Sequence, residues 1–301
     1  MKSIVVVGSL NMDLVTQTER VPVMGETLTG VAFKTVCGGK GGNQAFAAAR
    51  LGGKVTMLGC VGNDVFGKEL IRSLSEQGIK CEHISICEGT ESGTASITVC
   101  DGDNSIIIIP GANGLVSVDY VKENETILKE ADFIVLQLEI PLATVEYIVD
   151  FANVHGIPVM LNPAPAQKLS DELLKKVTYM IVNETECEFF TGDKVTTVED
   201  TKKGIALLKE KGIRHVIVTL GSQGAVYDMG GEVYHEPARK VKAVDSTAAG
   251  DTFTAGIVVS LLEGKDMSES IRFATVASSI TVTRMGAQTS IPSREEVELG
   301  K

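Results

Sequence analysis

The chain has 301 residues, and its 28 Lys and Arg against 39 Asp and Glu give a formal net charge of −11 at pH 7. This acidic balance argues against nucleic acid as the main partner, because a phosphate backbone is bound by clustered Lys and Arg. The composition, 44% hydrophobic and 22% charged, is that of a globular protein, and no apolar run approaches the roughly 18 to 20 residues that span a bilayer, so we expect a cytoplasmic, unprocessed protein with no membrane partner.

Short β-branched runs alternate along the chain with longer segments of helical period. The runs that predict strands are 3–8, 54–60, 133–138, 158–161, 180–182 and 216–220, and the segments that predict helices are 43–51, 66–76, 142–154, 202–211, 252–262 and 269–284. Strand, helix and strand in this order predict right-handed crossovers and a mainly parallel sheet flanked by helices on both faces. Because no linker or repeat interrupts the pattern, we expect a single doubly wound α/β domain over residues 1–301.

Two regions break this alternation and have no helix to cover them. Residues 13–33 are polar and rich in turn formers, and residues 91–109 read as two strands around the hairpin signal Cys100-Asp101-Gly102-Asp103. We expect these regions to form a small β-sheet lid over the carboxyl ends of the parallel strands, where open α/β sheets bind their ligands. An exposed lid face needs a partner, which favours a homodimer formed through it.

Two polar segments near the amino terminus are candidates for a ligand site. Asn11 and Asp13 follow the first predicted strand, where they either form a turn or bind hydroxyl groups. Residues 38–42 hold four glycines and are followed by Asn43. Glycines let a sugar or a phosphate lie against the backbone, and Asn43 offers a donor and an acceptor, although a flexible connector is the alternative interpretation.

Asn183 and Glu186 follow a predicted strand in the second half of the chain. Their amide and carboxylate oxygens would order a hydrated Mg²⁺, or would cap an acidic helix start. The residue types alone support both the Mg²⁺ site and the helix cap.

The strongest candidate site is the small-residue segment 243–253, which leads into the predicted helix at 252–262. Small residues allow a tight backbone turn in which successive N–H groups point in the same direction. A helix N-terminus adds partial positive charge, so this segment predicts an anion hole. Asp251 would either cap the helix or act as a functional carboxylate. The second acid, Asp245, favours the functional role, because a cap needs only one.

Several common signatures are missing. No GxGxxG follows the first predicted strand, and no GxxxxGK[ST] occurs, which disfavours a dinucleotide-binding fold and a P-loop. There is also no GxSxG nucleophile elbow and no HExxH zinc helix.

Taken together, these segments resemble the PfkB family of carbohydrate kinases, in its ribokinase branch, over nearly the whole chain. The matching motifs lie in the family's order at 38–44, 137–139, 161–165, 183–186, 219–224 and 244–253. The resemblance implies transfer of the γ-phosphoryl group of ATP to O5 of D-ribose, giving D-ribose 5-phosphate, on a fold whose β lid pairs into a homodimer.

The resemblance also implies roles for particular residues. The sugar would be held by Asn11, Met12, Asp13, Gly39, Lys40, Gly41, Gly42, Asn43, Glu139 and Asp251. ATP would contact Asn183, Thr219, Leu220, Gly221, Ser222, Gln223, Gly224, Gly250 and Asp251, with Thr275 near the adenine, where some relatives have His or Asn. Asp251 would be the general base, and Ala248, Ala249, Gly250 and Asp251 would form the anion hole.

Cations would balance the phosphate charge, since a P-loop lysine is missing. The resemblance implies that Asn183 and Glu186 organise Mg²⁺ through water. It places a K⁺ site, bound partly by main-chain oxygens, on Asp245, Thr247, Thr281, Arg284, Gly286 and Ser290.

Other functions stay open. Within the family, deoxyribokinase and fructokinase activities are alternatives, whereas Asn11, Asp13 and Glu139 favour a small sugar over a nucleoside. Outside it, a catalytically inactive sugar sensor or a Rossmann oxidoreductase is possible, although a sensor needs no base and the second lacks its glycine motif.

Overall fold

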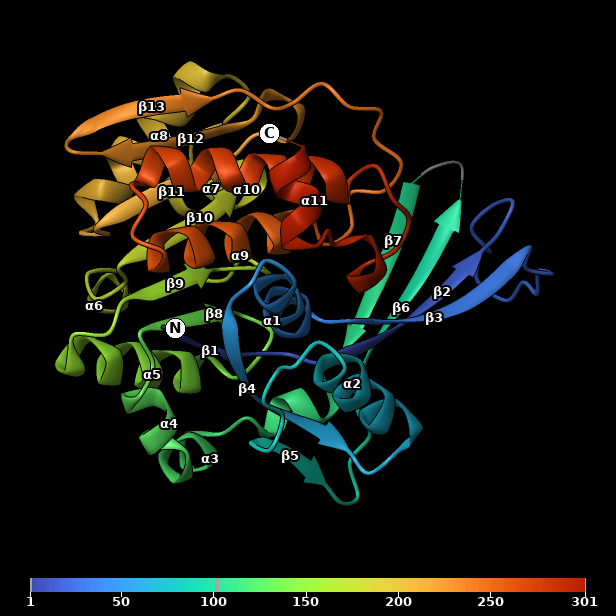
Figure 1. Ribbon diagram of the computed structural model, residues 1–301. Helices are drawn as coiled ribbons and strands as arrows, with labels where there is room; N and C mark the ends of the chain where they lie inside the picture. Colours follow the sequence, from blue (N-terminus) through green and yellow to red (C-terminus); the bar gives the residue numbers. More distant parts are fainter. Residues whose placement is uncertain (1, 101–102, 301) are drawn as a thin grey trace.

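A nine-stranded sheet runs through the middle of the molecule (Figure 1). The structure is a computed structural model that describes residues 2–100 and 103–300. Across the large sheet the strands are β13 (Glu232–Glu236), β12 (Ala225–Met229), β11 (His215–Thr219), β10 (Tyr179–Asn183), β9 (Val159–Asn162), β8 (Phe133–Gln137), β1 (Ser3–Val7), β4 (Lys54–Gly62) and β5 (Ile84–Cys87). Neighbours from β11 to β5 are parallel, whereas β12 and β13 are antiparallel. The predicted parallel sheet is confirmed.

Helices cover both faces of the large sheet and enclose two hydrophobic cores. One core contains residues of α1 (Lys40–Arg50), α2 (Val65–Ser75), α9 (Ala249–Leu262), α10 (Met267–Thr281) and α11 (Arg294–Leu299). The other contains residues of α3 (Val118–Glu123), α4 (Glu125–Lys129), α5 (Leu142–His155), α6 (Asp171–Leu174), α7 (Glu184–Thr191) and α8 (Val198–Glu210). Ile4 lies in the first core and Val5 in the second, because successive side chains of a strand face opposite sides.

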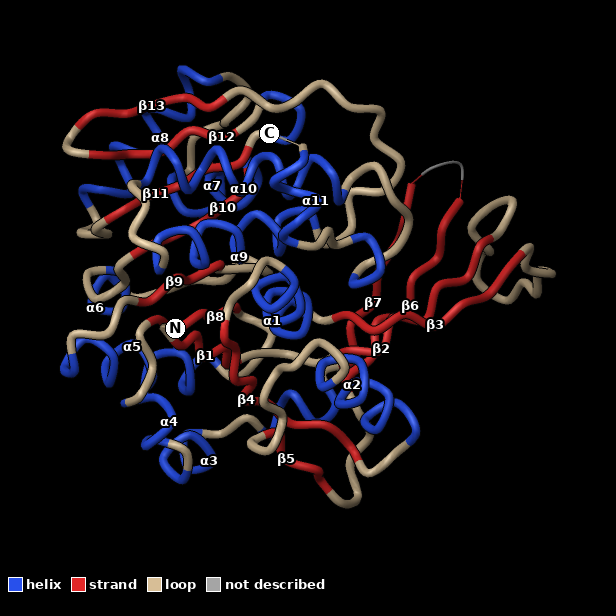
Figure 2. Tube along the Cα trace, viewed as in Figure 1, coloured by secondary structure: helices blue, strands red, loops and turns tan. Residues whose placement is uncertain are grey.

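A second, four-stranded sheet projects from one side of the large sheet (Figures 1 and 2). Its strands, in spatial order, are β3 (Ala32–Gly38), β2 (Asn11–Gln17), β6 (Gly93–Cys100) and β7 (Asp103–Ile109). We call it the small sheet. Strands β6 and β7 pair antiparallel, as the hairpin prediction requires, and residues 101–102 of that hairpin lie outside the described residues.

The small sheet differs from the predicted lid in its first half. The structure forms strands at Asn11–Gln17 and Ala32–Gly38, so regular structure begins before residue 13 and continues beyond residue 33. Asn11 and Asp13 therefore lie at the start of a strand and not in a turn after β1. Only three residues, 8–10, connect β1 to β2, so the two sheets meet directly at this point.

Several element boundaries also differ from the prediction. Helix α1 begins at Lys40 and not at residue 43, and α9 begins at Ala249 and not at residue 252. Both early starts contain glycine, whose low helix propensity hides them in the sequence. Strands β5, β12 and β13 were not expected, and neither were the short helices α3, α4 and α6, whereas the start of α7 agrees with the helix-cap interpretation of Asn183 and Glu186. None of the described helices is long and apolar enough to cross a bilayer.

Glycines in the segment 38–42 are required by close packing against the residues that follow β1. Gly39 has a φ of 82°, and a Cβ atom there would lie 2.7 Å from the backbone nitrogen of Asn11. A Cβ atom on Gly41 would lie 2.6 Å from the backbone of Gly8 and Ser9. The flexible-connector interpretation is therefore wrong, because these glycines bring the start of α1 against residues 8–10.

We predict that Gly41→Ala destabilises the fold by about 2 kcal/mol, since backbone atoms on both sides must move to admit the methyl group. Urea unfolding measures this loss. Gly114→Ala is the matched control, because its Cβ atom would meet nothing within 4 Å. Equal midpoints for the two variants would contradict the packing argument.

Candidate active site

The carboxyl ends of the parallel strands meet at one edge of the large sheet, next to the small sheet. A cavity of about 880 Å³ lies there. Predicted site residues that line it are Asn11, Asp13, Gly39, Lys40, Asn43, Glu139, Asp245, Thr247, Ala248, Asp251 and Gly286. The small sheet adds apolar side chains that include Val15, Ile97, Ile106 and Ile108. The small sheet therefore contributes both polar side chains, such as Asn11 and Asp13, and apolar side chains to the cavity.

Asp251 lies in the first turn of α9 and is only 7% exposed. Its Oδ2 accepts a hydrogen bond from Nδ2 of Asn43, and its Oδ1 accepts one from Nε2 of Gln44, both at 3.0 Å. The N-cap of α9 is instead Ala248, which makes no side-chain cap. The interpretation of Asp251 as a helix cap is therefore wrong, and the carboxylate stays available at the cavity.

The backbone at the start of α9 leaves the amides of Gly250 and Asp251, and that of the N-cap Ala248, without an acceptor among the described residues. Ala248 has a φ of 61°, the left-handed conformation that non-glycine residues rarely adopt and that occurs mostly at functional sites. The N–H groups of Gly250 and Asp251 donate to no described residue, whereas that of Ala249 donates to the carbonyl oxygen of Ser246 at 3.2 Å. Of the four amides predicted to form the anion hole, that of Ala249 is therefore not available, because it already donates a hydrogen bond within the protein.

Glu139 holds the glycine-rich segment against the end of β1. Its Oε2 accepts hydrogen bonds from Ser9 Oγ at 2.5 Å and from the backbone nitrogen of Lys40 at 3.0 Å. Ser9 Oγ in turn accepts from the backbone nitrogen of Gly41 at 3.2 Å. Glu139 therefore positions the segment, and its other oxygen, Oε1, remains for a ligand. Ser9 was not predicted as a site residue.

Four carboxylates, those of Asp13, Glu139, Asp245 and Asp251, and the two cations Lys34 and Lys40 line the cavity. Burial, followed by repulsion from Glu139 and Asp251, raises the pKa of Asp13 to about 7. Burial alone would lower the pKa of Lys40, but the nearby carboxylates, Asp251 foremost, raise it above its ordinary value. Lys40 therefore stays charged, and the site favours ligands that donate hydrogen bonds or bring cations.

Amide side chains complete the cavity wall. Oδ1 of Asn43 is buried with no hydrogen-bond partner among the described residues, so it is a free acceptor at the cavity. Oδ1 of Asn11 accepts from Nδ2 of Asn113 at 2.7 Å, and Asn113 also bonds the backbone of Leu10. Asn113 therefore orients Asn11.

Some predicted sugar contacts lie elsewhere. The side chain of Met12 is 2% exposed and packs in a hydrophobic core, because its place on β2 turns it away from the cavity. Gly41 and Gly42 donate their backbone N–H groups to Ser9 and do not line the cavity. These three residues shape the site without facing it.

Asn183 and Glu186 form a capping box at the start of α7. Asn183 Oδ1 accepts from the Glu186 backbone, and Glu186 Oε2 accepts from the Asn183 backbone at 2.9 Å. Burial raises the pKa of Glu186 even though the Asn183 amide and Lys40 oppose this shift. The capping interpretation is confirmed, and Glu186 keeps one carboxylate oxygen outside the box.

The segment Thr219 to Gly224 forms a tight turn between β11 and β12. Thr219 pairs in register with Asn183 on β10, while Leu220 is 2% exposed in the core and cannot present its side chain to a ligand. Residues 221–223 form a short 3-10 helix. The backbone of Gly224 packs against Glu236, which lines a separate cavity of about 450 Å³.

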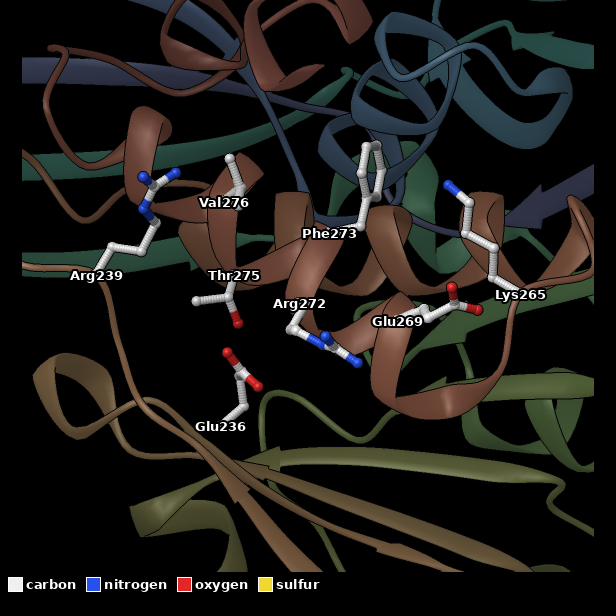
Figure 3. A pocket seen from close by; sticks show the side chains of 8 residues that line it. All are labelled: Glu236, Arg239, Lys265, Glu269, Arg272, Phe273, Thr275 and Val276. Atoms are coloured by element: carbon white, nitrogen blue, oxygen red, sulfur yellow. The ribbon is translucent and has the colours of Figure 1, made fainter. Parts of the chain in front are cut away.

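Thr275 lines this second cavity from α10 (Figure 3). Its hydroxyl group is buried without a hydrogen-bond partner among the described residues, and it points toward the Glu236 carboxylate. The second cavity therefore contains an unsatisfied polar atom that a bound ligand would satisfy.

Asp245 ties two loops together beside the main cavity. Its Oδ1 accepts from the backbone and hydroxyl of Thr247, and its Oδ2 accepts from the backbone of Gly286 at 2.9 Å. Burial would raise the pKa of Asp245, but these hydrogen bonds hold it below its ordinary value.

The other residues of the predicted K⁺ loop direct their side chains elsewhere. Thr281 contacts Thr252 of α9 at 3.2 Å, and Arg284 pairs with Glu296 at 2.6 Å. Ser290 returns a hydrogen bond to the carbonyl oxygen of Ala287. Only main-chain oxygens of Thr281, Arg284 and Ser290 thus remain for a cation. No cluster of three or more His, Cys, Asp or Glu side chains with metal-site geometry occurs in ranges 2–100 and 103–300.

A buried carboxylate beside two free helix amides is the arrangement that a kinase needs, since it can accept an alcohol proton next to a bound phosphate. The comparisons agree with this class. Residues 1–294 match the pfkB family carbohydrate kinase pattern, so the chain belongs to that family.

Named relatives cover nearly the whole chain. The ribokinase of Haemophilus influenzae is 42% identical over 296 residues, covering 98% of this chain and 97% of that protein. The deoxyribokinase of Salmonella typhi is 40% identical over 295 residues, covering 97% of this chain and 96% of its own length. The structure of Arabidopsis thaliana ribokinase complexed with ribose and ATP has a TM-score of 0.94 at 33% identity, covering 100% of this chain and 99% of that one. The predicted family and fold are thus confirmed.

We predict that Asp13→Asn stabilises the ligand-free protein increasingly as the pH rises. With a native pKa of about 7 and an unfolded value near 3.9, Asp13 holds a proton only in the folded state between these values. The wild type therefore loses stability as the pH rises through that window. In urea unfolding, the gain from the substitution should be on the order of 2 kcal/mol larger at pH 8 than at pH 5. The exposed Asp193→Asn is the control, and a gain that does not depend on pH would contradict the prediction.

Proposed function

We propose that this chain is an ATP-dependent kinase that phosphorylates D-ribose at O5 to give D-ribose 5-phosphate. The observation that carries the proposal is Asp251, a buried carboxylate at the cavity whose own N–H and that of Gly250 are free. Two named relatives, a ribokinase and a ribokinase complexed with ribose and ATP, support this substrate pair.

In this mechanism Asp251 is the general base. Each of its carboxylate oxygens accepts one hydrogen bond from α1 and keeps a lone pair for the hydroxyl proton of the sugar. The free amides of Gly250 and Asp251 would stabilise the charge on the transferred phosphoryl group, and the dipole of α9 adds to them. Lys40 supplies a nearby positive charge.

The sugar would lie against Asn11, Asp13, Gly39, Lys40, Asn43 and Glu139, as the cavity lining supports. The free Oδ1 of Asn43 would accept from a hydroxyl group. Because Asp13 is only about half ionised near pH 7, its protonated form can donate one hydrogen bond and accept others, which suits a molecule with several hydroxyl groups.

ATP would bind between the start of α9 and the turn at Thr219 to Gly224. We place its adenine in the second cavity near Thr275, whose hydroxyl lacks a partner among the described residues (Figure 3). Gly221, Ser222, Gln223 and Gly224 would contact the nucleotide mainly through their backbone, since Leu220 is in the core.

Cations complete the proposal. Asn183 and Glu186 would hold Mg²⁺ through water, and the raised pKa of the buried Glu186 fits this role, because a nearby cation would relieve the cost of its charge. Bound Mg²⁺ would neutralise phosphate charge. K⁺ would bind at the loop that Asp245 joins to Gly286, with Thr247, Thr281, Arg284 and Ser290 contributing mainly backbone oxygens.

Deoxyribokinase activity is the second candidate, because a named deoxyribokinase is 40% identical over almost the same length. The two activities differ in whether the 2-hydroxyl of the sugar is recognised. An inactive sensor remains the candidate from another class, and the availability of Asp251 argues against it.

We further propose that residues 1–301 act as one catalytic domain in the cytoplasm, where ATP is available, and that the small sheet is a lid that forms a homodimer. Ile106, Ile107, Ile108 and Ile109 are 43–65% exposed on β7. Ile106 and Ile108 line the cavity and Ile107 and Ile109 face the other side, so both faces carry apolar side chains that suit burial by a second copy.

We predict that the wild type turns over ribose faster than 2-deoxyribose or fructose in a coupled assay with ATP, and that Asp251→Asn lowers kcat by roughly 10²- to 10⁴-fold. Ribose binding, measured by calorimetry, should persist because the amide keeps the shape of the site. The control is the exposed Asp119→Asn on α3. Near-normal turnover of Asp251→Asn would refute the base, and a preference for 2-deoxyribose would favour the second candidate.

We also predict that a variant carrying both Ile106→Glu and Ile107→Glu is a monomer, whereas the wild type is a dimer. Adjacent residues of a strand face opposite sides, so this variant charges both faces of the small sheet. Light scattering after gel filtration gives the mass. Val154→Glu, at an exposed position on α5, should leave the dimer intact, and a monomeric wild type would contradict the proposal.

A further inference from the structure

Asp251, the proposed base, accepts a hydrogen bond from Gln44, whose side chain does not line the cavity. Gln44 is 1% exposed, does not line the cavity, and donates from Nε2 to Asp251 Oδ1 at 3.0 Å. A glutamine side-chain amide can donate a hydrogen bond to a carboxylate only from its nitrogen. If the Gln44 amide turned over, its oxygen would face the carboxylate and repel it, so the orientation of this amide matters for the base.

A backbone carbonyl sets that orientation through a chain of hydrogen bonds. The carbonyl oxygen of Ile181 can only accept, so the Asn162 amide must turn its nitrogen toward it, at 3.0 Å. Asn162 Oδ1 then faces Gln44 Nε2 at 3.4 Å. Both hydrogens of the Gln44 amide thus have acceptors, Asn162 and Asp251, and its oxygen must point the other way.

The oxygen of the Gln44 amide accepts a hydrogen bond from Gln137. Located at the end of β8 and 0% exposed, Gln137 donates from Nε2 to Gln44 Oε1 at 2.7 Å. Its own Oε1 is buried without a partner among the described residues and lies where a Cβ atom on Gly8 would come within 2.0 Å. An unpaired buried carbonyl oxygen costs stability, so stability alone does not explain a glutamine here.

We propose that Gln44 is a positioning residue for Asp251 and that Gln137 acts through it, by fixing, together with Asn162, which end of the Gln44 amide faces the base. The proposal rests on the proposed role of Asp251 as the base. Gln137, Gln44 and Asp251 come from β8, α1 and α9, so this chain of amides aligns the base with the edge of the large sheet. Loss of the Gln137 donor frees Gln44 to rotate and weakens the hold on the carboxylate.

Two substitutions of Gln137 test this. Gln137→Met keeps the length of the side chain but donates nothing, and we expect kcat to fall about 3- to 10-fold, the effect of one hydrogen bond, with KM for ribose changed less than about twofold. Gln137→Glu adds a carboxyl group that donates to Gln44 only while it is protonated. Once ionised it can only accept, so it draws the Gln44 nitrogen away from Asp251.

We therefore expect the kcat of Gln137→Glu to equal or exceed that of Gln137→Met at pH 6 and to fall about fivefold or more below it at pH 9. The charged groups around this site, Asp251, Asp13, Glu139 and Lys40, are present in both variants, so the ratio of the two kcat values removes the pH dependence that the variants share. A Gln137→Met variant with wild-type kcat, or a ratio that does not change with pH, would overturn the proposal.

A stability control separates positioning from packing. Thr144→Val removes another buried hydrogen bond, from Thr144 Oγ1 to the carbonyl oxygen of Val116, on the opposite face of the sheet. It should lower the unfolding midpoint without changing kcat. If Gln137→Met does the same, its role is only structural.

A measurement without turnover keeps this test independent of the proposed function. Hydrogen exchange of ¹⁵N-labelled glutamine side chains, with Gln44 identified by the signal lost in Gln44→Met, should show a protected Gln44 amide in the wild type and at least about tenfold faster exchange in Gln137→Met. If Gln44 is protected but the wild type does not phosphorylate sugars, the function fails and the amide chain stands. An unprotected Gln44 in an active wild type overturns the amide chain.

Discussion

The contact between α1 and α9 at Asp251 is the interaction on which the site depends. Two side-chain amides of α1 hold the carboxylate at 3.0 Å each, and hydrogen bonds to a charged group contribute about 1.5–3 kcal/mol apiece. This contact fixes the Asp251 carboxylate relative to the glycine-rich segment, next to the amides of Gly250 and Asp251, which donate to no described residue. Close packing of Gly39 and Gly41 against residues 8–10 brings α1 near enough for it.

Electrostatics explains why so acidic a cavity can bind a phosphate donor. Asp13, Glu139 and Asp251 line the cavity together with Lys40, and burial raises the pKa of Asp13 to about 7, so that its carboxyl group is only partly ionised at neutral pH. The remaining negative charge is offset by the dipole of α9, by Lys40 and, in the proposed complex, by Mg²⁺. The ligand-free site is thus electrostatically unfavourable, and binding of a donor-rich sugar and of cations relieves it.

Much of this architecture could be predicted from the sequence, because the alternation of apolar runs and helical periods is strong from Ser3 onward. What escaped prediction depends on tertiary contacts. Strand β13 carries charged residues at the sheet edge, and the short apolar run of β12 is interrupted by Asp228. The start of α9 was misplaced, since Ala249 and Gly250 join the helix only where α1 and α9 pack together. Gln137 and Gln44 are separated by 93 residues, and no local pattern could reveal that they meet.

The short connection between β1 and β2 joins two parts of the molecule that both line the cavity. Asn11 and Asp13 belong to the small sheet, whereas Lys40, Asn43 and Asp251 belong to helices of the body. Residues 8–10 also pack closely against Gly39 and Gly41, so the start of β2 cannot shift without disturbing the glycine-rich segment. A substitution within these three residues would therefore alter both halves of the pocket at once.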